Sequence, residues 1–158
     1  MLAVSRTIAV VLLAAFVSFH ITSPFMAARE PLPQDKSGAQ RYRIFGPGHE
    51  LVDIVDNTLV GTVFYIVSGH GGPDSGARGS REGRTLCEDE YAYDIGLRTA
   101  RLLLQHGARV HIIVRDPDDG IRSTEYLDCD TDEYALGGHA LPVDQGKRLR
   151  QRVSIINN

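Results

Sequence analysis

The chain has 158 residues, a formal net charge of −3, 42% hydrophobic residues and 23% charged residues. This composition is typical of one globular domain with a modest core, and it excludes disorder of the whole chain. Two cysteines are too few for a disulfide-dense scaffold, and a pI of about 6.0 argues against nucleic acid as a partner. The densest basic stretch, from Lys147 to Arg152, is interleaved with apolar residues and predicts a solvated helix face.

The first 28 residues have the layout of a secretory signal peptide. Arg6 supplies a positive charge, an apolar run without charges follows from Thr7 to Ile21, and small residues end the segment at Met26-Ala27-Ala28. A strict Ala-x-Ala cleavage site is absent, so an uncleaved N-terminal anchor is the alternative. We expect the protein to be exported to the periplasm or cell envelope, with membrane contact only through an uncleaved N-terminal segment.

A short polar segment separates this signal from the rest of the chain. Residues 29–41 contain two prolines and predict a flexible linker, so the folded domain is expected at residues 42–158. Cys87 and Cys129 both lie in the exported part. An oxidising compartment permits a bridge between them, and the sequence leaves both redox states open.

The middle of the chain predicts a strand, a loop, a helix and a second strand. Thr62 to Val67 is a continuous apolar run typical of a buried strand, and a glycine-rich loop follows from Ser68 to Gly83. A helix is expected from near Thr85 to a glycine stop at Gly107. Its apolar face carries Tyr93, Leu97, Ala100 and Leu104. With a second strand at Val110 to Val114, the order predicts an α/β fold with a mostly parallel sheet flanked by helices.

The C-terminal third is acidic and then helical. Residues 115–143 lack hydrophobic periodicity and predict a long loop. The run from Asp128 to Asp132 resembles the start of a calcium loop, but Glu133 and His139 occupy positions that require Gly and Glu, which favours a solvated loop. Residues 144–156 predict a helix whose apolar face carries Leu149, Val153 and Ile156. No strand follows this helix, so we expect the sheet to be incomplete at its C-terminal end.

His70 and Glu88 are the candidate metal ligands. His70 follows the carboxyl end of the first predicted strand, and Glu88 opens the predicted helix at the same edge of the sheet, so the two side chains can converge. One imidazole and one carboxylate are two of the three protein ligands of a catalytic zinc. The alternatives are a solvated loop histidine and a capping box between Thr85 and Glu88. Gly71 and Gly72 allow close approach of a substrate to the backbone and are candidate substrate-binding residues.

The loop and helix together resemble a known family. The stretch Val67 to Ala77 (VSGHGGPDSGA), followed by Glu88, is similar to zinc-dependent N-acetylmuramoyl-L-alanine amidases of the type 3 family. That family has a Gly-His-Gly-Gly-x-Asp-x-Gly-Ala loop, a glutamate that leads a helix, a glycine turn, a strand and an Arg-Asp pair. The turn here is His106-Gly107-Ala108 and the pair is Arg115-Asp116. The resemblance covers Thr62 to Asn158.

The resemblance implies fold, site and activity. It implies an amidase/phosphorylase-like α/β fold, with residues 42–158 as a partial catalytic domain. His70 and Glu88 would bind zinc, and zinc-activated water would hydrolyse the amide bond between N-acetylmuramic acid and L-alanine of the stem peptide. Peptidoglycan as the substrate agrees with the export signal.

The chain departs from the family pattern at several positions. Val67-Ser68 stand where the family has Asp-Pro, which removes a carboxylate that would orient His70. Ala92 replaces an asparagine that often follows the glutamate. The family takes its third zinc ligand, a histidine, and its general-base glutamate from segments that would follow Asn158. No general base is therefore assigned in this chain.

Three other histidines are poor substitutes for the third ligand. His139 lies in a glycine-rich loop, His111 lies inside a predicted strand and His106 lies at a helix end. Two hypotheses follow: an exported zinc amidase whose sequence is incomplete here, or a truncated or degenerate, catalytically inactive cell-wall-binding module. Under either hypothesis, hydrolysis by this chain alone is expected to be very weak or absent.

Overall fold

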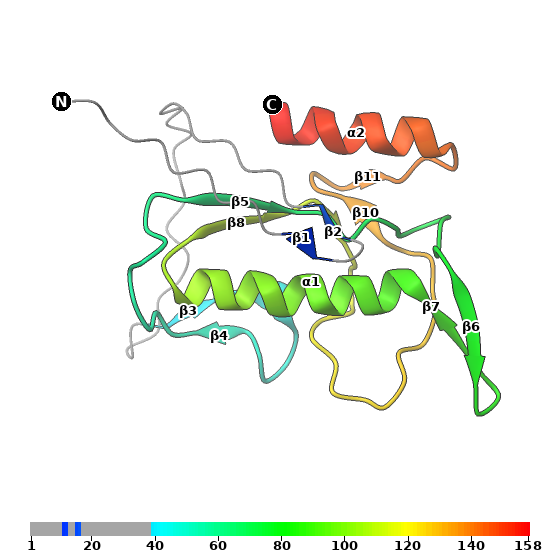
Figure 1. The fold of residues 1–158 in the computed structure, drawn as a ribbon, viewed down its shortest axis with the longest axis horizontal. Coiled ribbons are helices and arrows are strands. Elements are labelled where there is room, and N and C mark those ends of the chain that lie inside the picture. Colours follow the sequence, from blue (N-terminus) through cyan, green and yellow to red (C-terminus); the bar gives the residue numbers. More distant parts are fainter. Residues whose placement is uncertain (1–10, 13–14, 17–38) are drawn as a thin grey trace.

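The structure, a computed structural model, describes residues 11–12, 15–16 and 39–158. It is a mixed α/β fold with two α-helices and several small sheets (Figure 1). Its elements are, in chain order, β1 (Val11–Leu12), β2 (Ala15–Phe16), β3 (Gln40–Arg41), the 3-10 turn η1 (Arg43–Phe45), β4 (Leu51–Val52), β5 (Val63–Ile66), β6 (Arg78–Arg81), β7 (Arg84–Cys87), α1 (Glu88–Gln105), β8 (Arg109–Ile112), β9 (Val114–Arg115), β10 (Tyr134–Ala135), β11 (His139–Ala140) and α2 (Gln145–Asn157).

The N-terminal predictions fall largely outside this description. Apart from β1 and β2, which pair antiparallel, the predicted signal segment lies outside the described residues, and so do residues 29–38 of the predicted linker. The last three residues of that predicted linker are folded: Ala39 is buried, and β3 pairs with β4. Within the described residues, no helix is long and apolar enough to cross a membrane.

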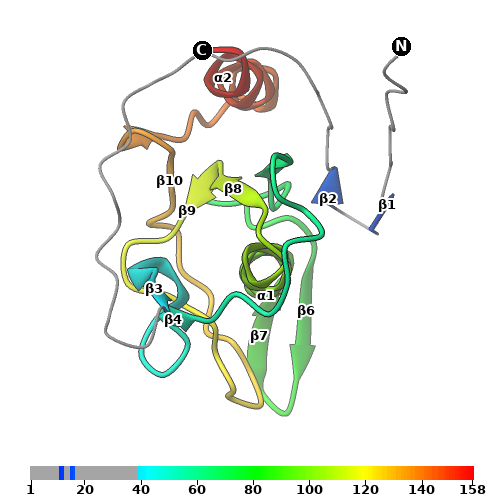
Figure 2. The ribbon, with the colours of Figure 1, turned by 90° about the vertical axis from the view of Figure 1, so that its left-hand side faces the viewer.

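The predicted strand–helix–strand unit is confirmed. β5 and β8 pair in parallel with Val63 opposite Arg109 and Ile66 opposite Ile112, and α1 forms the crossover between them. The two views place α1 and α2 on opposite sides of this strand pair (Figures 1 and 2). The carboxyl end of β5 and the start of α1 lie at the same end of the molecule, next to the β6–β7 hairpin (Figure 1).

The prediction of a mostly parallel sheet is wrong for the described residues. β5–β8 is the one parallel pair among them, and every other named strand pair is antiparallel. A parallel pair needs a long crossover, and α1 is the only helix that connects two strands here. The predicted glycine loop contains β6 and the turn of the β6–β7 hairpin, and β7 occupies the start of the predicted helix, so that α1 begins at Glu88. The predicted acidic loop contributes β10 and β11 to a three-stranded sheet with β9.

The core lies between α1 and the parallel pair. The predicted apolar face of α1 is confirmed, because Tyr93, Leu97, Ala100 and Leu104 are all buried. They pack with side chains from the flanking segments, namely Phe45, Val52, Ile66, Ile112 and Ile121. This packing fixes the start of α1 relative to the end of β5, where the candidate ligands lie.

α2 contradicts its predicted orientation. Leu149 and Val153 are 53% and 56% exposed, whereas Arg148 and Arg152 are only 5% and 4% exposed. The basic stretch is therefore not a solvated face, because two of its guanidinium groups are turned into the molecule. Their partners, described below, are the carbonyls and the carboxylate of the loop that carries His70.

A disulfide bond joins the end of β7 to the acidic segment. Cys87, at the end of β7, is bonded to Cys129, with a Cα–Cα distance of 5.6 Å. The bond fixes the acidic segment at the residue immediately before Glu88. Of the two redox states that the sequence leaves open, the structure has the oxidised one.

Candidate metal centre

The structure brings the two predicted ligands together. His70 lies in the loop after β5, Glu88 is the first residue of α1, and His70 Nε2 is 3.7 Å from Glu88 Oε1. Both side chains are about one-third exposed, so the pair is open to solvent and to a substrate. The second oxygen of Glu88 accepts a hydrogen bond from the Ala77 backbone N–H at 2.8 Å, which fixes the carboxylate in this position.

The capping-box alternative is wrong. Thr85 lies in β7, the residue that caps α1 is Cys87, and its side chain makes no capping hydrogen bond. Glu88 bonds instead to Ala77, eleven residues earlier in the chain. Its carboxylate therefore serves the loop that carries His70.

Gly76 creates the space in which the two ligands meet. Its φ is +65°, a conformation that favours glycine. A Cβ atom at this position would lie 2.8 Å from Glu88 Oε2 and 2.9 Å from His70 Cδ2. Any larger residue would push the two candidate ligands apart.

Asp74 places a carboxylate beside the imidazole of His70, although the family's Asp-Pro pair is replaced here by Val67-Ser68. Its Oδ2 lies 3.2 Å from His70 Nδ1. The other ring nitrogen, Nε2, faces Glu88. Partial burial opposes ionisation of Asp74, but hydrogen bonds from His70 and the Gly76 N–H and the charge of Arg148 outweigh it and lower the pKa. Ser68 makes a different contact, a hydroxyl hydrogen bond to the His70 carbonyl.

Two buried arginines of α2 hold this loop from the other side. Arg148 Nη2 is 2.6 Å from Asp74 Oδ2, and Arg152 donates hydrogen bonds to the carbonyls of Gly69 and His70. Sequence reasoning missed both residues because their spacing along the helix also fits a solvated face. Their partners are 74 and 82 residues away in the sequence, and no local pattern marks such contacts.

The predicted substrate-binding glycines are packed against the protein. Gly71 and Gly72 are buried, and the Gly72 N–H donates to Glu133 Oε2 at 2.6 Å. A Cβ at Gly71 would lie 3.0 Å from Val114, and one at Gly72 would lie 3.1 Å from Leu141. Both glycines are needed for close packing of the loop, and a contact with substrate stays a prediction.

The other histidines have separate positions. His139 is exposed in β11, His106 Nδ1 is 2.8 Å from Asp56, and His111 stacks on Tyr65. Among the described residues, none of the groups that offer three or more ligand atoms includes His70. The pair of His70 and Glu88 has the separation and exposure that suit zinc, but these residues provide only two of the three ligands of a catalytic site.

Substitution of Asp74 tests the orienting contact. We expect Asp74→Asn to weaken zinc binding by about 10- to 100-fold, because loss of a carboxylate behind a ligating histidine lowers its basicity and order. Arg148→Gln is the matched control, since it breaks the ion pair with Asp74 but keeps the carboxylate beside His70. Zinc titration of the three proteins checks this, and equal affinities would show that Asp74 does not act on His70.

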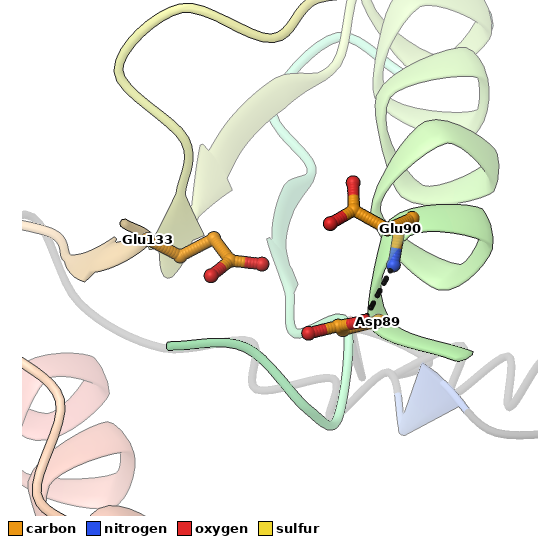
Figure 3. Close-up of side chains that lie close together, drawn as sticks. All are labelled: Asp89, Glu90 and Glu133. Carbon is orange, nitrogen blue, oxygen red and sulfur yellow. Dashed lines mark hydrogen bonds between the residues drawn. The ribbon is translucent and has the colours of Figure 1, made fainter. Parts of the chain in front are cut away.

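A group of buried carboxylates lies behind the glycine loop. Asp89 and Glu90 come from the first turn of α1, and Glu133 comes from the residue before β10 (Figure 3). Burial, followed by the nearby charge of Glu90, raises the pKa of Asp89 to about 6. Burial is also the largest cause that raises the pKa of Glu133 to about 7, against the hydrogen bond from Gly72.

The raised pKa of Glu133 predicts a pH-dependent stability. The folded chain holds a proton on Glu133 at pH values where the unfolded chain has lost it, so the free energy of unfolding falls as pH rises from about 4.5 to about 7. We expect Glu133→Gln to remove up to about 3 kcal/mol of this fall. Urea unfolding at pH 5 and pH 8 in a chelator checks it, with substitution of an exposed acid, Glu125→Gln, as the control. Equal pH dependence in wild type and Glu133→Gln would contradict the assignment.

One comparison with known proteins finds a relative. The chain is 32% identical over 100 residues to a protein of Bacillus subtilis (strain 168) named germination-specific N-acetylmuramoyl-L-alanine amidase. This chain is similar to part of an N-acetylmuramoyl-L-alanine amidase. The match covers 63% of the chain and 35% of the relative, so the chain spans about a third of that protein's length. No family model and no solved structure matches the chain.

Proposed function

We propose that this chain is part of an exported N-acetylmuramoyl-L-alanine amidase that acts on peptidoglycan with the help of zinc. The observation that carries the proposal is the pairing of His70 and Glu88 at 3.7 Å, at the edge where a strand ends and a helix begins. Similarity to the Bacillus subtilis amidase supports it independently of that geometry. The substrate bond would be the amide between N-acetylmuramic acid and L-alanine.

His70 and Glu88 would hold the metal, and the neighbouring residues have supporting roles. When bound, zinc supplies a Lewis acid that polarises a carbonyl and lowers the pKa of a water molecule. The Asp74 carboxylate lies 3.2 Å from Nδ1 of His70, and its negative charge favours the tautomer with the proton on Nδ1 and a free lone pair on Nε2. Arg152 bonds to the carbonyls of Gly69 and His70 and so fixes the backbone on both sides of His70, which keeps the imidazole at the sheet edge.

Export is part of the same proposal. The signal-like sequence at residues 1–28 and the disulfide between Cys87 and Cys129 both suit an oxidising compartment outside the cytoplasm. Peptidoglycan is found in that compartment. A substrate with carbohydrate and peptide parts would reach the open side of the His70–Glu88 pair.

Release of amino termini from peptidoglycan tests the activity. The full chain is incubated with purified peptidoglycan and zinc for many hours, and new L-alanine amino termini are labelled and counted by mass spectrometry. With two of the three ligands among its described residues, the chain should show slow, zinc-dependent release that Glu88→Gln abolishes. Retention of peptidoglycan by a chain that binds no zinc, or release that is the same in Glu88→Gln, would contradict the proposal; the first result would favour a binding module.

A further inference from the structure

Three buried carboxylates converge behind the glycine loop, apart from the His70–Glu88 pair. One oxygen from each of Asp89, Glu90 and Glu133 lies within 4.8 Å of the other two. The side chains are turned toward a common space between the start of α1 and the segment before β10 (Figure 3). Asp89 and Glu90 are 1% exposed and Glu133 is 6% exposed. Water therefore does little to stabilise their charges.

Two of these carboxylates already have fixed partners. Glu90 Oε2 is 2.8 Å from Arg122 Nη2, and Glu90 Oε1 accepts a hydrogen bond from the Asp130 N–H at 3.0 Å. Glu133 Oε2 accepts from the Gly72 N–H at 2.6 Å. These contacts hold both carboxylates in place and leave each with unused lone pairs.

Asp89 supplies the observation that points to a ligand. Its Oδ1 accepts a hydrogen bond from the Glu90 N–H at 3.1 Å, but Oδ2 is fully buried and has no hydrogen-bond partner. A buried acceptor without a partner is costly, and a buried charge without a counter-charge is more so. Figure 3 shows the Asp89 oxygen that takes no hydrogen bond from Glu90 turned toward the side on which Glu133 lies.

The charges of the cluster are not balanced by the protein. Among the described residues, Arg122 makes the ion pair with Glu90, and neither Asp89 nor Glu133 has one. The N-terminus of α1 contributes a partial positive charge worth about half a unit, which is too little for two further carboxylates. A bound divalent cation would provide the missing positive charge.

We propose that Asp89, Glu90 and Glu133 bind one calcium ion. Calcium takes oxygen ligands at about 2.3–2.6 Å, so oxygens up to about 4.8 Å apart can share one ion without rearrangement. The donor set holds carboxylate oxygens and no nitrogen or sulfur, which favours a hard cation over zinc. The ion links the first turn of α1 to the acidic segment and, through Gly72, to the loop that carries His70.

Calorimetric titration and thermal unfolding of the full chain with CaCl₂ test this site. One calcium ion per chain is expected, with an unfolding midpoint raised by about 10 °C at a hundredfold excess over Kd. Asp89→Asn and Glu133→Gln should each weaken calcium binding at least about tenfold. In a chelator at pH 8, Glu133→Gln should unfold at or above the wild-type temperature, because it removes an unbalanced buried charge; a merely structural role would lower that temperature.

Two matched variants separate this site from its neighbours. Asp132→Asn changes the exposed acid next to Glu133 and should bind calcium like the wild type. His70→Gln removes a candidate zinc ligand and should also leave calcium binding unchanged. The proposal is overturned if the wild type shows no calcium response, if Asp89→Asn and Glu133→Gln both respond like the wild type, or if Asp132→Asn abolishes binding. Dependence of calcium binding on His70 would likewise overturn it, whatever the outcome for the amidase.

Discussion

Glu88→Gln is expected to weaken zinc binding by at least about 100-fold, which is more than the loss of an orienting partner causes. The glutamine keeps an oxygen that can accept the Ala77 N–H, so the loop and the start of α1 should keep their structure. It loses the negative charge that faces His70 at 3.7 Å. Competition against a chromophoric zinc chelator measures the change.

Matched substitutions show whether the loss is specific. His70→Gln should weaken zinc binding as strongly as Glu88→Gln. Glu125→Gln and His139→Gln change exposed residues of the same types and should bind zinc like the wild type. If Glu88→Gln and Glu125→Gln have equal zinc affinities, Glu88 is not a ligand.

The second large effect concerns the disulfide bond. Replacing Cys87 and Cys129 together by serine should lower the free energy of unfolding by about 4 kcal/mol, because the bridge closes a loop between residues 42 positions apart. For a domain of this size, the thermal midpoint should fall by about 10 °C or more. Urea and thermal unfolding of the wild type and the double variant measure the difference.

A reducing agent provides the control for the disulfide. Dithiothreitol should lower the stability of the wild type to that of the double variant, and it should not affect the double variant. Thiol titration of the denatured, unreduced wild type should find no free cysteine. Two free thiols in the native protein, or a stability that dithiothreitol leaves unchanged, would contradict the bridge.

The parallel strand pair and α1 could be predicted from the sequence because their signals are local. A short apolar run, a helical face from Tyr93 to Leu104 and the glycine at 107 each depend on neighbouring residues. The sequence pattern does not predict the β6–β7 hairpin, because β6 is polar and exposed throughout and β7 has only two apolar residues, at its end. Its signal was the pair Glu82-Gly83, whose positive φ values of 53° and 77° form the two-residue turn.

The environment of His70 could be predicted only in part. The order strand, helix, parallel strand predicts that Glu88 at the start of α1 lies near His70 at the end of β5. The contacts that hold His70 in place come from α2 and from the loop after β5, and that order does not predict them. Asp74 was seen as a motif residue, and its position beside His70 depends on how the loop folds. Arg152 reaches the loop from 82 residues away, and burial of a charged group depends on such distant partners.

The buried carboxylates show the same limit. The sequence spacing places Glu133 at a position where a calcium loop requires glycine, and spacing alone therefore predicts a solvated residue. In the structure it joins Asp89 from α1, 44 positions earlier, through a shared buried space (Figure 3). Acidic residues are usually solvated. Burial alone distinguishes Asp89, Glu90 and Glu133 from the exposed acidic residues nearby, and the sequence does not reveal it.

The central claim is that His70 and Glu88 are zinc ligands, and X-ray absorption at the zinc K-edge of the zinc-loaded chain tests it most directly. One zinc per chain is expected, bound by nitrogen and oxygen only, with the scattering of a single imidazole that His70→Gln removes. An unchanged spectrum in His70→Gln, or sulfur among the ligands, would contradict it.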